Sequence, residues 1–469
     1  MSDVSRAFGE EISAEVGAPE HTHARVAAPL APSLRTQQMY EVGTAFCLIA
    51  LIFVLADTLF LEYYKQFPIW PTLTAGAVAW TLLIWPATLK RRLFEDAALL
   101  DRWCAWSVFA AFLALYGLSS FPNTPYDEQL RQAVALLHGH TYIDAPKSFL
   151  EAAQIGPYRY ALHPPLPAFL LMPIAAIWGM DTRETMWSLL IGALDAALAW
   201  RLLRRFRITV ATRVWLTVFF SAGTILWSES IYGNTWSMPE TCSIIFTLLA
   251  LDEAFGEARP LLLGIYAGLA SLSRYELAIA GGTYAILALM RGRRIRDLFL
   301  MIPGFVAVGI PFVGINEARY HSFFDQGVSI TGPANAPAFG LRYLLGNINT
   351  IFFMIPTIND TFPYFHPNFG GLSLIFTSPA LVLAFKAKLS KLEPILMLVT
   401  AFLVSIPSLL CYANGFAQYG TRHYLQTFPF FLVMMAMGMR HLDRLSKILI
   451  ATSVVFITYG VIHIRIYGL

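Results

Sequence analysis

The chain has 469 residues, of which 57% are hydrophobic and only 13% charged, and its mean hydropathy is +0.57. Soluble domains usually carry about 25% charged residues, so this composition excludes an ordinary soluble protein and predicts an all-α polytopic membrane protein. The net charge of +3 gives no indication of a nucleic-acid partner. The four cysteines lie in apolar runs without the spacing of metal ligands, as is typical of small buried side chains.

The chain opens with a polar segment, rich in Ala and Pro, that lacks an apolar core. We expect a disordered cytoplasmic tail at 1–40, two additional transmembrane helices within 41–102, and a catalytic domain at 103–469. A helix needs roughly 20 apolar residues to cross a bilayer, and on this criterion the sequence predicts about thirteen spans. They lie near 42–62, 69–89, 103–120, 184–203, 212–230, 238–254, 260–274, 276–291, 298–316, 371–387, 393–412, 422–440 and 447–466.

Clusters of Lys and Arg occur between these spans at 90–102, 201–207, 291–296, 386–391 and 440–447. Because Lys and Arg favour the cytoplasmic side of a membrane, we expect all these clusters to lie there. This holds only if segment 164–180, which is short and rich in proline, lies at the outer membrane face as an interfacial or re-entrant helix. Segments 121–183 and 317–370 then become long external loops.

Two adjacent carboxylates, Asp127 and Glu128, open the first external loop in the stretch YDEQLRQAVALLHGHTYID. A carboxylate can accept the proton of an attacking hydroxyl group, and a positioned base of this kind contributes roughly 10²- to 10⁴-fold to a rate. Acidic residues also suit the amino terminus of a helix, so a structural role for either residue stays open.

Cationic side chains at the predicted outer ends of other spans could bind a phosphate group. Arg274 lies in a turn between two short apolar helices, and Arg422 and His423 follow QYG at the end of another span. Arginine suits phosphate because its planar guanidinium offers two parallel hydrogen bonds. The alternative for Arg274 is a structural pair with Glu276, two residues further on.

The order of these features resembles the GT-C superfamily of membrane glycosyltransferases. An apolar span, the acidic pair, LRQAVALLHGHTY and YALHPPLPAFLLMPIAAIWG follow one another as in bacterial relatives of protein O-mannosyltransferases and of the lipid A aminoarabinose transferase. The stretch GIYAGLASLSRYELAIAG is similar to the paired short helices of that family. The likeness covers about residues 103–440.

The resemblance implies a GT-C-like fold and transfer of a sugar from a polyprenyl-phosphate donor to a hydroxyl group of a glycan, lipid or protein. It implies that Asp127 lies near the reacting centre, with Glu128 beside it, and that His163 lies near the donor phosphate. We therefore expect Asp127 to face a cavity and Glu128 the surface. The family's second acidic residue has no clean counterpart here, and Glu240 or Asn234 could serve.

Further residues are candidates for binding the sugar or the acceptor. They are Tyr126, Tyr160, Asn234, Glu240 and Tyr419. Aromatic residues of the external segments, Tyr142 and Tyr158 among them, could stack on a sugar ring or simply form an interfacial belt. No cofactor is predicted with certainty, and a divalent metal stays open.

The rival hypothesis is a transporter or flippase of a lipid-linked or anionic solute. Transporters often show internal repeats and charges near the membrane midplane, whereas here no clear repeat is seen and the candidate charges gather at one face. In either case the expected location is the inner (plasma) membrane, with the site facing the periplasm or cell exterior. Membrane lipid is then a partner, because the isoprenoid tail of a donor would lie between the spans.

Overall fold

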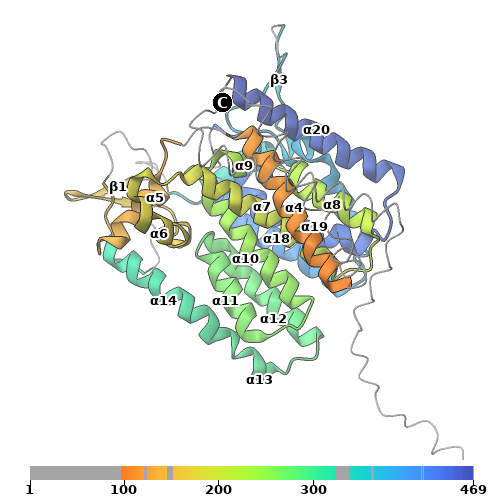
Figure 1. Cartoon of the computed structure of the whole chain (residues 1–469), viewed down its shortest axis with the longest axis horizontal. Coiled ribbons are helices and arrows are strands. Elements are labelled where there is room, and N and C mark those ends of the chain that lie inside the picture. The colour runs from red at the N-terminus through yellow and green to blue at the C-terminus, as the bar shows by residue number, and fades with distance from the viewer. Residues whose placement is uncertain are drawn as a thin grey trace, which may run out of the picture.

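The computed structural model describes residues 97–120, 124–144, 152–323, 337–360, 364–413, 415 and 417–467. These residues form a mainly helical bundle with two small two-stranded sheets (Figure 1). The predicted tail at 1–40 and the predicted spans at 42–62 and 69–89 lie outside the described residues.

The helices follow one another with short connections. The first half contains α4 (Ala97–Ser119), α5 (Glu128–Leu137), α6 (Leu166–Trp178), α7 (Glu184–Leu203), α8 (Val210–Ala222), α9 (Leu226–Tyr232), α10 (Ser237–Ala254) and α11 (Pro260–Ser271). The second half contains α12 (Ala280–Met290), α13 (Ile295–Leu298), α14 (Met301–Tyr320), α16 (Leu344–Phe353), α17 (Leu374–Thr377), α18 (Leu392–Leu410), α19 (Phe428–Gly438) and α20 (Arg444–Tyr467). Short 3-10 helices are η1 (Gly179–Asp181), η2 (Tyr275–Ile279), η3 (Leu341–Tyr343), η4 (Pro379–Lys386) and η5 (Arg422–Thr427).

Several of these helices are long and apolar enough to cross a membrane. They are Glu184–Leu203, Ile295–Tyr320, Leu392–Leu410 and Arg444–Ile464. α8 and α9 together would form a fifth span, bent by 47° at the break between them. The described residues thus have the character of an all-α membrane protein with four or five candidate spans. The predicted total of about thirteen, based on runs of roughly 20 apolar residues, is not confirmed.

Backbone-breaking residues explain why several predicted spans are shorter helices. Segment 371–387 begins at Gly371, whose φ of 91° is in the left-handed region, and it is interrupted at Pro379, where α17 gives way to η4. Proline lacks the N–H group that would continue a helix. Between α11 and α12 the chain likewise passes through a turn and η2.

Helix α6 occupies the segment expected to lie along the membrane face. It has 13 residues and contains Pro173. At about 1.5 Å per residue it is shorter than the roughly 30 Å hydrocarbon layer, and its placement along the membrane face stays a prediction. On one face of α6, Leu171 and Ala175 are buried against the rest of the protein, whereas Ile177 and Trp178 at the end of the helix are exposed.

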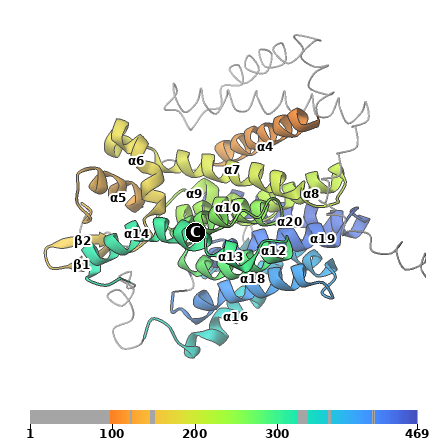
Figure 2. The ribbon, with the colours of Figure 1, turned by 90° about the horizontal axis from the view of Figure 1, so that it is seen from below.

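A continuous apolar core joins α7 to the helices around it. Ala193, Ala196 and Phe220 are among its fully buried members. Gly192 of α7 allows the close approach of α9, since a Cβ atom there would lie 2.0 Å from the Oγ atom of Ser230. Seen from below, α4 and α7 run together on one side of the bundle, with α16 and α18 on the opposite side (Figure 2).

One end of the bundle is held by ion pairs among the basic clusters. The pairs are Arg201–Asp252 (2.9 Å), Arg205–Asp252 (2.6 Å), Arg204–Asp101 (3.3 Å), Arg213–Asp101 (2.6 Å) and Lys386–Asp443 (2.6 Å). A backbone bond from Thr209 N–H to the carbonyl of Arg440 (3.1 Å) joins two further segments. Clusters predicted to share one side of the membrane therefore share one end of the bundle.

A small subdomain, which contains the acidic pair at the start of α5, covers one side of the bundle. It consists of α5, α6 and the antiparallel hairpin of β1 (Ala152–Ile155) and β2 (Tyr158–Ala161), which lie together in both views (Figures 1 and 2). The hydroxyl of Tyr320, at the end of α14, donates to the carbonyl of Ala161 and so attaches the hairpin to the bundle. A second hairpin joins β3 (Thr357–Ile358) to β4 (Phe365–His366).

Candidate functional site

The acidic pair lies at the start of α5, and its two members differ in burial. Asp127 is the N-cap residue but makes no capping bond with its side chain. Its carboxylate instead accepts from Nε of Arg131 at 2.7 Å, and its side chain is 14% exposed. Glu128 is fully buried and accepts from the backbone N–H of Leu162 at 2.8 Å. The expectation that Glu128 faces the surface is therefore wrong, because helix α5 turns this residue toward the segment before α6.

The acidic pair is fastened to the amino-terminal end of α10 by backbone contacts. The N–H of Glu128 donates to Oγ1 of Thr235 (2.9 Å), and the N–H of Thr235 donates to the carbonyl of Tyr126 (3.0 Å). Glu240 lies one turn into α10. Asp252 lies 12 residues later, about 18 Å along the helix axis, so Glu240 and the basic clusters occupy opposite ends of the bundle.

Glu240 lies at the centre of a buried group of charged side chains. Its carboxylate is 0% exposed and contacts NH1 of Arg274 at 3.1 Å and Nδ1 of His423 at 3.5 Å. Arg274 also pairs with Glu276 at 2.7 Å, so the structural pair considered as the alternative role of Arg274 is present. Gln426 donates to the same oxygen of Glu276 at 2.9 Å, so Arg274 lies between two carboxylates, one of which is also held by a neutral amide.

Arg274 remains charged in this setting. Burial acts to lower the pKa of the guanidinium, but the carboxylates of Glu240 and Glu276 outweigh it and raise the pKa above its usual value. A guanidinium held between two acids is fixed in position, and any anion that approaches it competes with carboxylates already bound.

Arg422 extends the group toward the surface of the protein near Tyr126. It is 8% exposed, and its guanidinium carbon lies 5.7 Å from the ring centre of Trp236, within the range of a cation–π contact. Trp236 in turn packs on Tyr126 with ring centres 4.8 Å apart. Tyr126 is 39% exposed, so a continuous chain of contacts runs from the surface to the buried charges.

His163 joins the group from the loop before α6. Burial first, and then positive charges led by Arg274 and Arg422, lower the pKa of His163 to about 3. Its imidazole is therefore neutral at physiological pH and can exchange a hydrogen bond but carries no charge. Its Nε2 atom is buried and has no hydrogen-bond partner among the described residues.

Ionisable residues of the site were missed in the sequence, Arg319 and Glu184 among them. Arg319, 2% exposed at the end of α14, donates to the carbonyl of Ala161 at 3.4 Å and lies near enough to Glu128 and His163 for its charge to act on them. Glu184, the first residue of α7, is fully buried and interacts electrostatically with Asp127 and Glu128. Both terminate apolar runs, and an ionisable residue at such a position is a signal of function that could have identified them.

The remaining predicted residues have mainly structural contacts. The Oδ1 atom of Asn234 accepts from the N–H groups of Trp236 and Ser237 (3.1 and 2.9 Å), at the start of α10. Tyr160 packs edge-on against Tyr320, with ring centres 6.2 Å apart. Tyr419 is 1% exposed, and its hydroxyl donates to the carbonyl of Phe456 in α20 at 2.6 Å.

Within the described residues, no group of three or more His, Cys, Asp or Glu side chains has an arrangement that could hold a metal ion. The structure thus brings together His163, Arg274, Arg422, His423 and Glu240, while the acidic pair lies beside them across the loop before α10. Comparisons of the chain with protein-family models, curated proteins and solved structures found no match.

Proposed function

We propose that this chain is an integral membrane glycosyltransferase that transfers a sugar from a polyprenyl-phosphate donor to an acceptor hydroxyl at the outer face of the inner (plasma) membrane. The observation that carries the proposal is the convergence of Arg274, Arg422 and His423 around the buried carboxylate of Glu240, with His163 from a third segment close to the two arginines. Two of these four residues, Arg274 and Arg422, carry planar guanidinium groups, and a guanidinium suits a leaving phosphate. The acceptor is a glycan, a lipid or a protein.

The proposed reaction breaks the bond between the anomeric carbon and the phosphate oxygen, whose electron pair leaves with the polyprenyl phosphate. A new bond forms between the anomeric carbon and the acceptor oxygen, and the proton of that hydroxyl passes to Asp127. Asp127 supports this role because its carboxylate is partly exposed and held by Arg131. Glu128 holds the segment that carries His163, through its bond to Leu162.

Arg422 is assigned to the donor phosphate, with the neutral His163 as a hydrogen-bonding partner. Arg274 positions the carboxylates behind them. The arginines at the opposite end of the bundle take no part in this scheme, and Arg204, paired with Asp101 at 3.3 Å, therefore offers a matched control.

The test measures release of polyprenyl phosphate from a labelled polyprenyl-phosphate sugar by purified full-length protein. Arg422→Ala is expected to weaken donor affinity tenfold or more, since losing a charged hydrogen bond costs about 1.5–3 kcal/mol. Arg422→Lys keeps the charge and should retain part of the affinity, whereas Arg204→Ala should bind donor as the wild type does. Translocation of the labelled lipid across vesicles without phosphate release would replace this proposal with the transporter hypothesis.

A further inference from the structure

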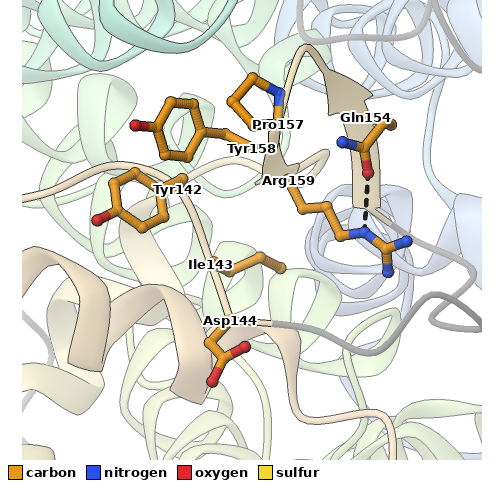
Figure 3. Close-up of a pocket in the computed structure, with 7 residues that line it drawn as sticks. All are labelled: Tyr142, Ile143, Asp144, Gln154, Pro157, Tyr158 and Arg159. Atoms are coloured by element: carbon orange, nitrogen blue, oxygen red, sulfur yellow. Dashed lines mark hydrogen bonds between the residues drawn. The ribbon is translucent and has the colours of Figure 1, made fainter.

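A pocket of about 420 Å³ lies between the β1–β2 hairpin and the loop that follows α5 (Figure 3). Two tyrosine rings, Tyr142 and Tyr158, form one side of it, and Gln154 and Arg159 of the hairpin form the other. This pocket belongs to the external segment that opens with the acidic pair, but it is separate from the buried charges around Glu240.

The aromatic side of the pocket is a stack of exposed rings. Tyr142 packs face to face on His140, with ring centres 4.0 Å apart and an interplanar angle of 10°. Its ring also contacts Tyr158, with centres 4.6 Å apart and the planes tilted by 32°. Tyr142 is 36% exposed and Tyr158 46% exposed. Exposed tyrosines held rigid by stacking provide an apolar surface with a polar edge, which matches the C–H faces and hydroxyl rim of a sugar ring.

The opposite side of the pocket provides planar hydrogen-bonding groups. Nε of Arg159 donates to Oε1 of Gln154 at 2.9 Å, and Nε2 of Gln154 donates to the carbonyl of Gly156 at 2.6 Å. These bonds hold the guanidinium and the amide in fixed orientations. A few positioned polar groups opposite an aromatic wall are typical of a site for a small polar ligand.

The pocket is joined to the proposed base by one side chain. Arg131 donates through NH1 to the carbonyl of Asp144, which lines the pocket, at 2.6 Å. The same guanidinium donates through Nε to the carboxylate of Asp127 at 2.7 Å. A molecule bound in the pocket would therefore be separated from Asp127, the residue assigned to take the acceptor proton, by Asp144 and the guanidinium of Arg131.

We infer that this pocket binds the acceptor and that the acceptor is a carbohydrate chain. One sugar unit of the acceptor stacks on Tyr158 and forms hydrogen bonds with Gln154 and Arg159. The rest of the carbohydrate chain then runs toward Asp127. The inference rests on the proposed function, since it names the acceptor class among glycan, lipid and protein. It also predicts a binding activity that needs neither donor nor turnover.

The test probes an array of defined oligosaccharides with the full-length protein in fluorescent nanodiscs. The wild type should bind at least one glycan, and Tyr158→Ala should weaken this binding by about three- to tenfold, the size of an aromatic contact. Tyr158→Phe keeps the ring and should restore most of it. Phe365→Ala is the matched control, because Phe365 is a comparably exposed aromatic (48%) in the other hairpin.

Absence of glycan binding by the wild type, or equal binding by Tyr158→Ala, would overturn the inference. Displacement of the glycan by a polyprenyl-phosphate sugar would do the same, because the pocket would then hold the donor sugar. Phosphate release from the donor is measured separately. A protein that binds glycan but releases no phosphate would refute the proposed function and leave the carbohydrate pocket standing.

Discussion

Removing the guanidinium of Arg274 should expose how much the buried charges contribute to the fold. Arg274→Met keeps much of the side-chain length but leaves the carboxylate of Glu240, which is 0% exposed, without its 3.1 Å partner. Breaking a buried pair in this way typically costs about 3–5 kcal/mol. We expect the free energy of unfolding to fall by about 3 kcal/mol, the lower end of that range, because Arg422 and His423 remain close to Glu240.

The assay is the free energy of unfolding of the purified protein in mixed micelles of a mild detergent and SDS. The double variant Arg274→Met/Glu240→Gln removes both charges and should be more stable than Arg274→Met alone, with a coupling of about 1 kcal/mol or more. The control is Arg296→Met, whose pair with Asp297 is long (3.9 Å) and exposed and should contribute at most about 1 kcal/mol. An Arg274→Met protein as stable as the wild type would refute the reasoning.

Three further outcomes test the site and its orientation. The pKa of His163 is lowered from 6.5 to about 3, so below pH 6.5 the unfolded chain binds a proton that the folded protein does not, and the folded protein loses stability as the pH falls toward 3. The free energy of unfolding of His163→Gln should therefore depend less on pH over that window than that of the wild type. Asp127→Asn should lower turnover of the donor by roughly 10²-fold or more with little loss of stability, whereas Glu128→Gln should mainly destabilise the protein; comparable turnover in Asp127→Asn and the wild type would remove the proposed base. In a background whose cysteines are replaced by serine, Asp144→Cys should react with an impermeant thiol reagent on intact cells and Arg204→Cys should not, and the reverse labelling pattern would contradict the orientation.

The composition of the charged group could be predicted from the sequence, because each member marks the end of an apolar run. An arginine or histidine there must find a partner or water, so such residues tend to gather at one end of a bundle. Glu240 and Arg274 were both candidates, and they pair. Arg319 was missed because the run NEARY at 316–320 reads as the polar end of a span rather than as part of a site.

The relative burial of the acidic pair could not be predicted, for a geometric reason. Adjacent helical residues point about 100° apart, so their orientation depends on the rotation of α5 about its axis. That rotation is set by tertiary contacts, the bonds of Glu128 to Thr235 and Leu162, which connect segments far apart in the chain. The predicted number of spans is not confirmed within the described residues, because hydropathy alone does not reveal where a break such as that at Pro379 divides an apolar run.

The ion pairs at the basic end of the bundle have a consequence for the order in which the chain is made. Lys and Arg orient a membrane helix while it is being inserted. When α7 emerges from the ribosome, Arg201 and Arg205 precede their partner Asp252 by about fifty residues, roughly the length of α8, α9 and most of α10. We therefore expect these arginines to be unpaired positive charges while α7 is inserted and to pair with Asp252 only when α10 has been made. The same two side chains thus first direct the orientation of a helix and later fasten it to its neighbour.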